Sequence, residues 1–165
     1  MSDMSYPEPR YFGDDGEMSA QFRPATAPAD LAYPNGGTAG YLATGATTNG
    51  QFGLYQWNMS GARSGPDPHF HRTISESFYI LTGTIRIYNG AKWVDHVPGD
   101  FVHVPEGGVH GFRNESGEPA SMLLMFHPGA PREEYFEGLL TIGDLTDEER
   151  KEFFARHDNY WIEEA

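Results

Sequence analysis

The stretch PHFHRTISESFYILTG, residues 68–83, decides both the fold and the chemistry that we expect of this chain. It places His69 and His71 two residues apart and Glu76 five residues further on, directly before a run of strand-forming residues. Residues i and i+2 of a strand project from the same face, so the two imidazoles point the same way. Two histidines at a strand end are more often polar surface than metal ligands. A metal site therefore requires a further ligand elsewhere in the chain.

A second stretch, GDFVHVPEGGVHGFRN at residues 99–114, offers that ligand. His110 follows a Gly- and Pro-containing turn, and Phe112 and Asn114 lie in strand phase behind it. If the fold brings both stretches together, three imidazoles and one carboxylate converge on one point. Such a set suits divalent Fe, Mn, Co, Ni, Cu or Zn and leaves positions open for water or substrate.

The composition is that of a folded, acidic domain. The 165 residues are enough for one domain with a buried core, and 38% of them are hydrophobic. A formal net charge of −13, without a cluster of Lys and Arg, argues against nucleic acid or an anionic membrane as partner. The lack of cysteine excludes disulfides, thiolate ligands and a cysteine nucleophile. No signal-like or membrane-spanning apolar run is present, so we expect a cytoplasmic protein.

Turn residues and short apolar runs predict a β-rich centre. Residues 40–127 contain many brief strand-like pieces, and Asn49-Gly50 between two of them is a strong hairpin signal. Many short strands at close spacing imply an antiparallel sandwich or barrel. Residues 1–39, rich in Pro, Gly, Asp and Ala, show no period and are expected to form an irregular arm.

Residues 128–165 change to a helical pattern. The segment APREEYFEGLL looks helical, and TDEERKEFFARH begins with Thr146 three residues before Glu149, the spacing of a capping box. Phe153 and Phe154 give this second helix an apolar side. We expect it to pack on the outside of the barrel or on a partner subunit. Because the arm and this helix offer more apolar surface than one barrel needs, we also expect a homodimer.

The two histidine stretches resemble the two sequence motifs of the cupin superfamily. The resemblance spans about residues 40–127 and rests on the spacing of ligand-type and turn residues, which are His69, His71, Glu76 and Gly83 in the first motif and Gly99, Pro105, Glu106, Gly107, His110 and Asn114 in the second. One departure is Arg63, which stands where the first motif has its leading glycine. Gly65 can take over the role of that glycine in shaping a turn.

The resemblance implies a single-domain cupin, an all-β protein with a jelly-roll-like antiparallel barrel. It also implies one divalent transition metal in the mouth of the barrel, either Fe, Ni, Mn, Co, Cu or Zn. The ligands that it implies are His69, His71, Glu76 and His110.

Four further histidines are expected to have roles other than metal binding. His103 could line the pocket or the outside of the barrel, and His127 could face its mouth. His96 and His157 resemble surface or packing residues.

A finer resemblance concerns the reaction. TTNGQFGLYQW, the second histidine stretch and PGAPREEYFEGL are similar to bacterial quercetinases, which are cupin dioxygenases that cleave flavonols. This resemblance implies an oxidoreductase that takes a small phenolic aromatic substrate and dioxygen. It also implies that Glu76 accepts the proton of the substrate hydroxyl. No cluster of Lys and Arg lies near the histidine motifs, so a strongly anionic substrate such as a sugar phosphate is less attractive than a neutral or phenolic one.

Other functions stay open at this point. A cupin-type cyclase of aromatic polyketides would use the metal as a Lewis acid and consume no oxygen. A cupin that binds a small molecule without turnover is the third possibility. Glu76 could also hold the metal without moving a proton, because coordination lowers the basicity of a carboxylate.

Overall fold

The computed structural model describes residues 5–162 and shows a mostly β molecule with two short α-helices. In chain order the strands are β1 (Leu31–Ala32), β2 (Thr38–Ala43), β3 (Gly53–Met59), β4 (His69–Phe70), β5 (Ser75–Thr82), β6 (Ile85–Tyr88), β7 (Trp93–His96), β8 (Phe101–Val104), β9 (Gly111–Arg113), β10 (Ala120–His127) and β11 (Tyr160–Trp161). The helices are α1 (Arg132–Gly138), the 3-10 helix η1 (Ile142–Asp144) and α2 (Asp147–Arg156).

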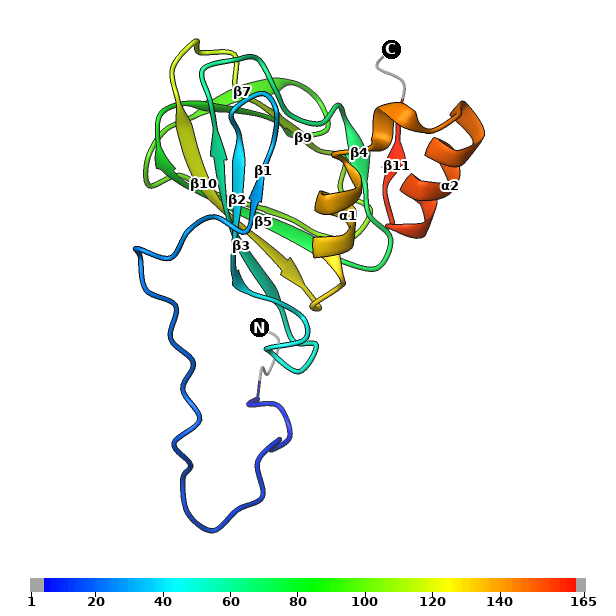
Figure 1. Cartoon of the computed structure of the whole chain (residues 1–165). Helices are drawn as coiled ribbons and strands as arrows, with labels where there is room; N and C mark the ends of the chain where they lie inside the picture. Colours follow the sequence, from blue (N-terminus) through cyan, green and yellow to red (C-terminus); the bar gives the residue numbers. More distant parts are fainter. Residues whose placement is uncertain (1–4, 163–165) are drawn as a thin grey trace.

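The strands form two sheets that enclose the core, and a small third sheet at one end (Figure 1). A six-stranded sheet has the order β1-β2-β3-β10-β5-β8, and a three-stranded sheet has the order β7-β6-β9. The third sheet pairs β4 with β11, and every strand pair is antiparallel. The predicted all-β, antiparallel, jelly-roll-like fold is thereby confirmed.

Alternating side chains explain how the long, neighbouring strands β5 and β10 turn one face of the larger sheet to the core. On β5, Phe78 and Ile80 are buried while Tyr79 between them is exposed, and on β10 Leu124 is buried beside the exposed Met125. This alternation directs one face of the sheet to the core. Phe78 meets Phe112 of β9 at 5.8 Å between ring centroids, so the two sheets pack against each other through aromatic rings.

At two turns the residue types in the sequence match the backbone conformation of the structure. The strands on either side of Asn49-Gly50 pair antiparallel, as the hairpin signal predicts, and both residues have positive φ (53° and 73°), but the loop between β2 and β3 covers residues 44–52 and is longer than a two-residue turn. Gly65 has φ +126°, and a Cβ at this position would lie 1.9 Å from the carbonyl oxygen of Phe112. Only glycine fits so close an approach, which accounts for the shifted glycine of the first motif.

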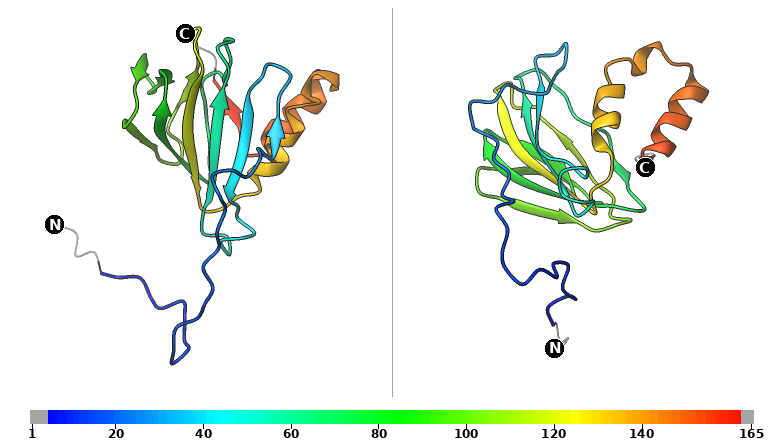
Figure 2. Two further views of the ribbon diagram at one scale, coloured as in Figure 1. Left: turned by 60° about the vertical axis from the view of Figure 1, so that its left-hand side comes forward. Right: turned by 60° about the horizontal axis from the view of Figure 1, so that its bottom comes forward.

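The N-terminal and C-terminal segments lie on different sides of the sheets (Figures 1 and 2). Residues 5–30 contain no helix or strand and extend away from the barrel, with Phe12 and Met18 fully or nearly fully exposed. The two helices lie beside β4 and β11. The predicted capping box is present, because the Thr146 side chain accepts from the Glu149 backbone and the Glu149 carboxylate accepts from the Thr146 backbone.

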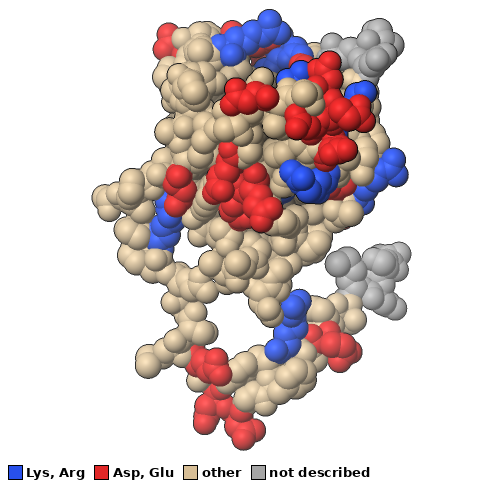
Figure 3. Space-filling model, turned by 45° about the vertical axis from the view of Figure 1, so that its right-hand side comes forward, with Lys and Arg blue, Asp and Glu red and all other residues tan. Residues whose placement is uncertain are grey.

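The surface is strongly acidic, in keeping with the net charge of −13. Acidic side chains gather in several groups on the face shown in Figure 3. Within residues 5–162, neither helix has the length and apolar character needed to cross a membrane.

Candidate metal centre

Four buried side chains that are typical metal ligands meet at one point of the fold. His69, His71, Glu76 and His110 each offer one ligand atom, and these four atoms all lie within 4.8 Å of one another. Metal–ligand distances of about 2.0–2.2 Å place the atoms of a ligand set no more than about 4.4 Å apart. The donor set and its spacing therefore fit a single divalent transition metal with small adjustments of the side chains.

Pairing between distant segments brings these residues together. His69 begins β4, and its backbone exchanges hydrogen bonds of 2.8 and 2.9 Å with the backbone of His110, just before β9. Glu76 lies on β5, which follows β4 after a short turn. Its Oε2 atom lies 2.7 Å from Nε2 of His110 and 3.1 Å from Nε2 of His71, within hydrogen-bond distance of both.

Backbone carbonyls orient all three imidazoles. The Nδ1 atom of His69 donates to the carbonyl of Asp67 at 2.8 Å, and Nδ1 of His110 donates to that of Gly108 at 2.9 Å. His71 uses a carbonyl from the C-terminal segment, that of Asp158, at 2.7 Å. Because each Nδ1 is occupied in this way, Nε2 is the nitrogen left to face the centre.

The electrostatics favour the metal-binding protonation states of Glu76 and His69, whereas the raised pKa of His110 favours a proton that a cation would have to displace. Burial alone would raise the pKa of Glu76, but hydrogen bonds from His110 and His71 outweigh it, and the pKa lies well below its ordinary value. Burial, together with the neighbouring His110, lowers the pKa of His69 to about 3. Burial also acts to lower the pKa of His110, but the Glu76 carboxylate raises it overall. Glu76 is therefore ionised and His69 neutral at neutral pH.

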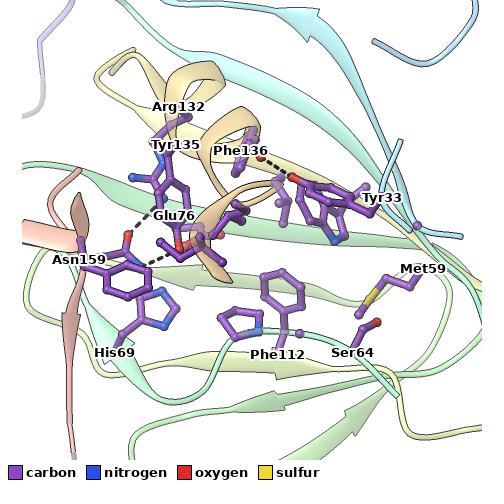
Figure 4. A pocket seen from close by; sticks show the side chains of 18 of the residues that line it. Tyr33, Met59, Ser64, His69, Glu76, Phe112, Arg132, Tyr135, Phe136 and Asn159 are labelled. Carbon is purple, nitrogen blue, oxygen red and sulfur yellow. Dashed lines mark hydrogen bonds between the residues drawn. The ribbon is translucent and has the colours of Figure 1, made fainter. Parts of the chain in front are cut away.

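A cavity of about 300 Å³ opens beside the cluster (Figure 4). Of the four candidate ligands, His69 and Glu76 border this cavity. The rest of the wall is mostly apolar and aromatic, and its aromatic residues are Tyr33, Trp57, Phe112, Phe126, Tyr135, Phe136, Phe154 and Trp161. A planar aromatic molecule suits a space with such walls.

The helical C-terminal segment makes one side of this cavity. Arg132, Tyr135 and Phe136 of α1 line it, together with Trp161 of β11. The expectation that a helix packs on the outside of the barrel or on a partner subunit concerned α2 alone, and the position of α1 and β11 at the cavity was not predicted. Beyond the fact that α1 is helical, no local signal in the sequence indicates this arrangement.

The other histidines lie away from the centre. His103 is exposed on β8, where its Nδ1 atom is 2.8 Å from Oγ of Ser77, and His127 is exposed at the end of β10. His96 is half-buried on β7, and the ring of His157 packs against that of Phe153 at 4.7 Å. None of the four borders the cavity.

The C-terminal segment also supports the centre through a residue that sequence reasoning did not single out. The Asp158 carboxylate accepts hydrogen bonds from the backbone of Arg72 at 2.9 Å and of Thr73 at 2.8 Å, and from Oγ1 of Thr73 at 2.7 Å. Its carbonyl receives the His71 imidazole. Asp158 thus holds the turn that follows His71 and the ring of His71 itself.

Comparison with known proteins identifies relatives of the barrel. Residues 57–126 match the cupin domain family. A segment of 48 residues is 38% identical to quercetin 2,3-dioxygenase from Bacillus subtilis (strain 168). This segment is 29% of the chain and spans only 14% of the length of that protein.

Solved structures agree on the fold. KdgF from Halomonas sp. matches with a TM-score of 0.59 at 16% identity, over 69% of this chain and 97% of that one. The polyketide cyclase RemF from Streptomyces resistomycificus matches with a TM-score of 0.55 at 20% identity, over 68% of this chain and 81% of that one. At these identities the likeness concerns the fold alone.

Proposed function

Since residues 57–126 of this chain form a cupin domain, we propose that the four clustered side chains bind one divalent transition metal in a metal-dependent oxidoreductase. More specifically, we propose a dioxygenase that cleaves a flavonol-like or other phenolic aromatic substrate. The ligands would be His69, His71, Glu76 and His110.

The observation that carries this proposal is the position of the cluster at the edge of an aromatic cavity. Two of its members, His69 and Glu76, border the space where a substrate would lie, while His71 and His110 do not border it. The local similarity to quercetin 2,3-dioxygenase supports the reaction class.

The residues of this chain have separable roles in such a reaction. When bound, a divalent metal lowers the pKa of a hydroxyl that coordinates to it and supplies the Lewis acidity for oxygen chemistry. Glu76, ionised and at the cavity wall, can accept the proton of that hydroxyl at a carboxylate oxygen. The rings of Trp57, Phe112 and Phe126 can hold a planar substrate and keep water from it.

The test is turnover of a flavonol by the metal-loaded protein. Quercetin is mixed with the protein in air, and the visible absorbance of the flavonol is followed together with oxygen consumption. We expect bleaching and oxygen uptake in a constant ratio. The His110→Ala variant should lose both activities, while His103→Ala, which removes an exposed imidazole of β8, should keep them.

Two outcomes count against the dioxygenase. Bleaching without oxygen uptake would indicate a non-oxidative reaction on the same substrate. Absence of any change with fully metal-loaded protein would remove the flavonol from consideration. A third variant, Glu76→Gln, addresses proton transfer: if it keeps its metal and loses turnover, Glu76 acts as a base as well as a ligand.

A further inference from the structure

A buried arginine lies in the wall of the cavity. Arg132, the first residue of α1, is 4% exposed, and it is the one Lys or Arg among the described residues that is fully buried. Its guanidinium lies over the ring of Tyr135 at 4.2 Å and over that of Phe126 at 5.0 Å. In Figure 4 it lies on the same side of the cavity as Tyr135 and close to Glu76. A charge in such a place is costly unless it has a partner.

The protein supplies this guanidinium with neutral partners only. Nη1 donates to the carbonyl of His157 at 2.7 Å, and Nη2 donates to Oδ1 of Asn159 at 3.1 Å. Nε has no hydrogen-bond partner within residues 5–162. A guanidinium has five N–H groups, and these contacts use two of them.

The carboxylates nearest to Arg132 form their hydrogen bonds with other residues. Glu76 and Asp158 are close enough to interact electrostatically with Arg132, but neither forms an ion pair with it. Glu76 instead accepts from His71 and His110, and the Asp158 carboxylate accepts from the turn at Thr73. Arg132 thus carries a positive charge with which no acidic group in the described part of the chain forms an ion pair.

We propose that Arg132 is a specificity-determining residue that receives an anionic oxygen of the substrate, so the natural substrate is an aromatic acid or an ionised phenol. The inference rests on the proposed function in so far as the cavity is the substrate site. It also adds a requirement, because a substrate needs one oxygen for the metal centre and a second, charged oxygen for Arg132. Paired with Arg132, that oxygen would offset the charge of the guanidinium and accept from N–H groups that the protein leaves unused.

The charge balance of the cavity supports this assignment. The ionisable groups on its wall are Glu76, His69, Arg132 and two tyrosines. A divalent cation at the candidate centre, added to Arg132 and set against the single Glu76 carboxylate, would leave the cavity with an excess of positive charge. A neutral ligand would leave that excess uncompensated in an apolar surrounding, whereas an anion would offset part of it.

The experiment measures binding of matched charged and neutral probes, with no turnover required. The full-length protein, with its metal content measured, is titrated with 2-naphthoate and with 2-naphthamide, which share a ring system and differ in charge. A second pair, 4-nitrophenolate and 4-nitroanisole, separates a phenolate from a carboxylate. Calorimetry reports each affinity.

We expect the wild-type protein to bind the anion of at least one pair about tenfold more tightly than its neutral counterpart. Arg132→Gln, which keeps a polar side chain but removes the charge, should reduce that ratio to about one. If only the naphthoate pair shows this preference, Arg132 binds a carboxylate, and if only the nitrophenolate pair shows it, Arg132 binds a phenolate. Arg156→Gln removes an exposed guanidinium that lies over Phe153, outside the cavity, and should keep the full ratio.

Equal affinity of the wild-type protein for both members of both pairs would overturn the proposal, and so would an undiminished ratio in folded Arg132→Gln. Thermal unfolding checks the fold of each variant. If Arg132→Gln does not fold, Arg132→Met supplies a neutral side chain of similar length for the same comparison. This test remains valid if the dioxygenase proposal fails, because calorimetry measures binding at fixed metal content and does not depend on oxygen uptake.

Discussion

Replacing Asp158 by asparagine tests whether the C-terminal segment positions a metal ligand. Asparagine keeps the shape of the side chain and tolerates the positive φ of 58° at this residue. It removes the charge and one of the two acceptor oxygens, so at least one donor of the turn at Arg72 and Thr73 loses its partner. The Asp158 carbonyl that accepts from His71 is then held in place less firmly, because the side chain of the same residue has lost a hydrogen bond.

Two magnitudes follow from these contacts. A hydrogen bond to a charged group contributes about 1.5–3 kcal/mol, and the partial exposure of this turn reduces the loss to about 1–2 kcal/mol. Disturbing a partner that orients a metal-bound histidine typically lowers metal affinity about 10–100-fold. Because the carbonyl itself remains, we expect Asp158→Asn to lie at the lower end, near about tenfold.

The assay combines chemical unfolding with competition against a metal indicator of known affinity. Asp100→Asn is the matched control, since the Asp100 carboxylate also accepts from a backbone N–H, that of Val97 at 2.9 Å, in a turn remote from the centre. Both variants should lose stability, and Asp158→Asn alone should lose metal affinity. Equal metal affinities in the two variants would refute the positioning role.

The stabilisation from Asp158 also depends on pH. Burial acts to raise the pKa of this carboxyl, but hydrogen bonds from Thr73 and from the backbone of Arg72 bring it below the ordinary value of 3.8. A carboxyl with a lowered pKa in the folded state stabilises the protein fully above its unfolded pKa, and this contribution is lost as the pH falls through the folded value. The unfolding free energies of wild type and Asp158→Asn should therefore converge below pH 3.8. A constant gap would contradict this origin of the stabilisation.

Three other predictions address the fold and the centre. Phe78→Ala, at a fully buried position between the sheets, should cost about 3–5 kcal/mol in chemical unfolding, and a loss below about 1 kcal/mol would place this ring outside the core. Thr146→Ala, which breaks the capping box of α2, should cost about 1 kcal/mol, and no measurable loss would indicate that the box is dispensable. Treatment with a chelator should lower the melting temperature of the wild type but not that of His110→Ala; equal shifts would mean that the stabilising ion lies elsewhere.

The features that the sequence predicted correctly are those that depend on neighbouring residues alone. The spacing of His69 and His71 places both rings on one side of the chain, and the Asn49-Gly50 pair lies with positive φ in the loop between two antiparallel strands. The contact of His110 with His69 and His71 could not be predicted from such a short-range pattern. Strand alternation does not tell which strands pair, so this contact was expected through the resemblance to cupins.

The parts that sequence reasoning missed arise from packing between segments far apart in the chain. Helical composition identified the region of α1 but not the face that it presents to the barrel, and so Arg132 went unnoticed as a cavity residue. No cluster of basic residues lies near the histidine motifs in the sequence, but Arg132 lines the same cavity as His69 and Glu76. The lack of nearby basic residues in the sequence therefore does not disfavour an anionic substrate. Asp158 was not identified for the same reason, since its contact with His71 joins residues that are 87 positions apart in the chain.

The most direct test of the central claim is the metal content of the purified protein. After loading with a divalent transition metal and removal of excess ion, elemental analysis should give about one metal per chain for the wild type. The double variant His71→Ala/His110→Ala should retain almost none, while His103→Ala/His127→Ala, which removes two exposed imidazoles, should match the wild type. Equal metal content in the two double variants, with both folded, would contradict the account.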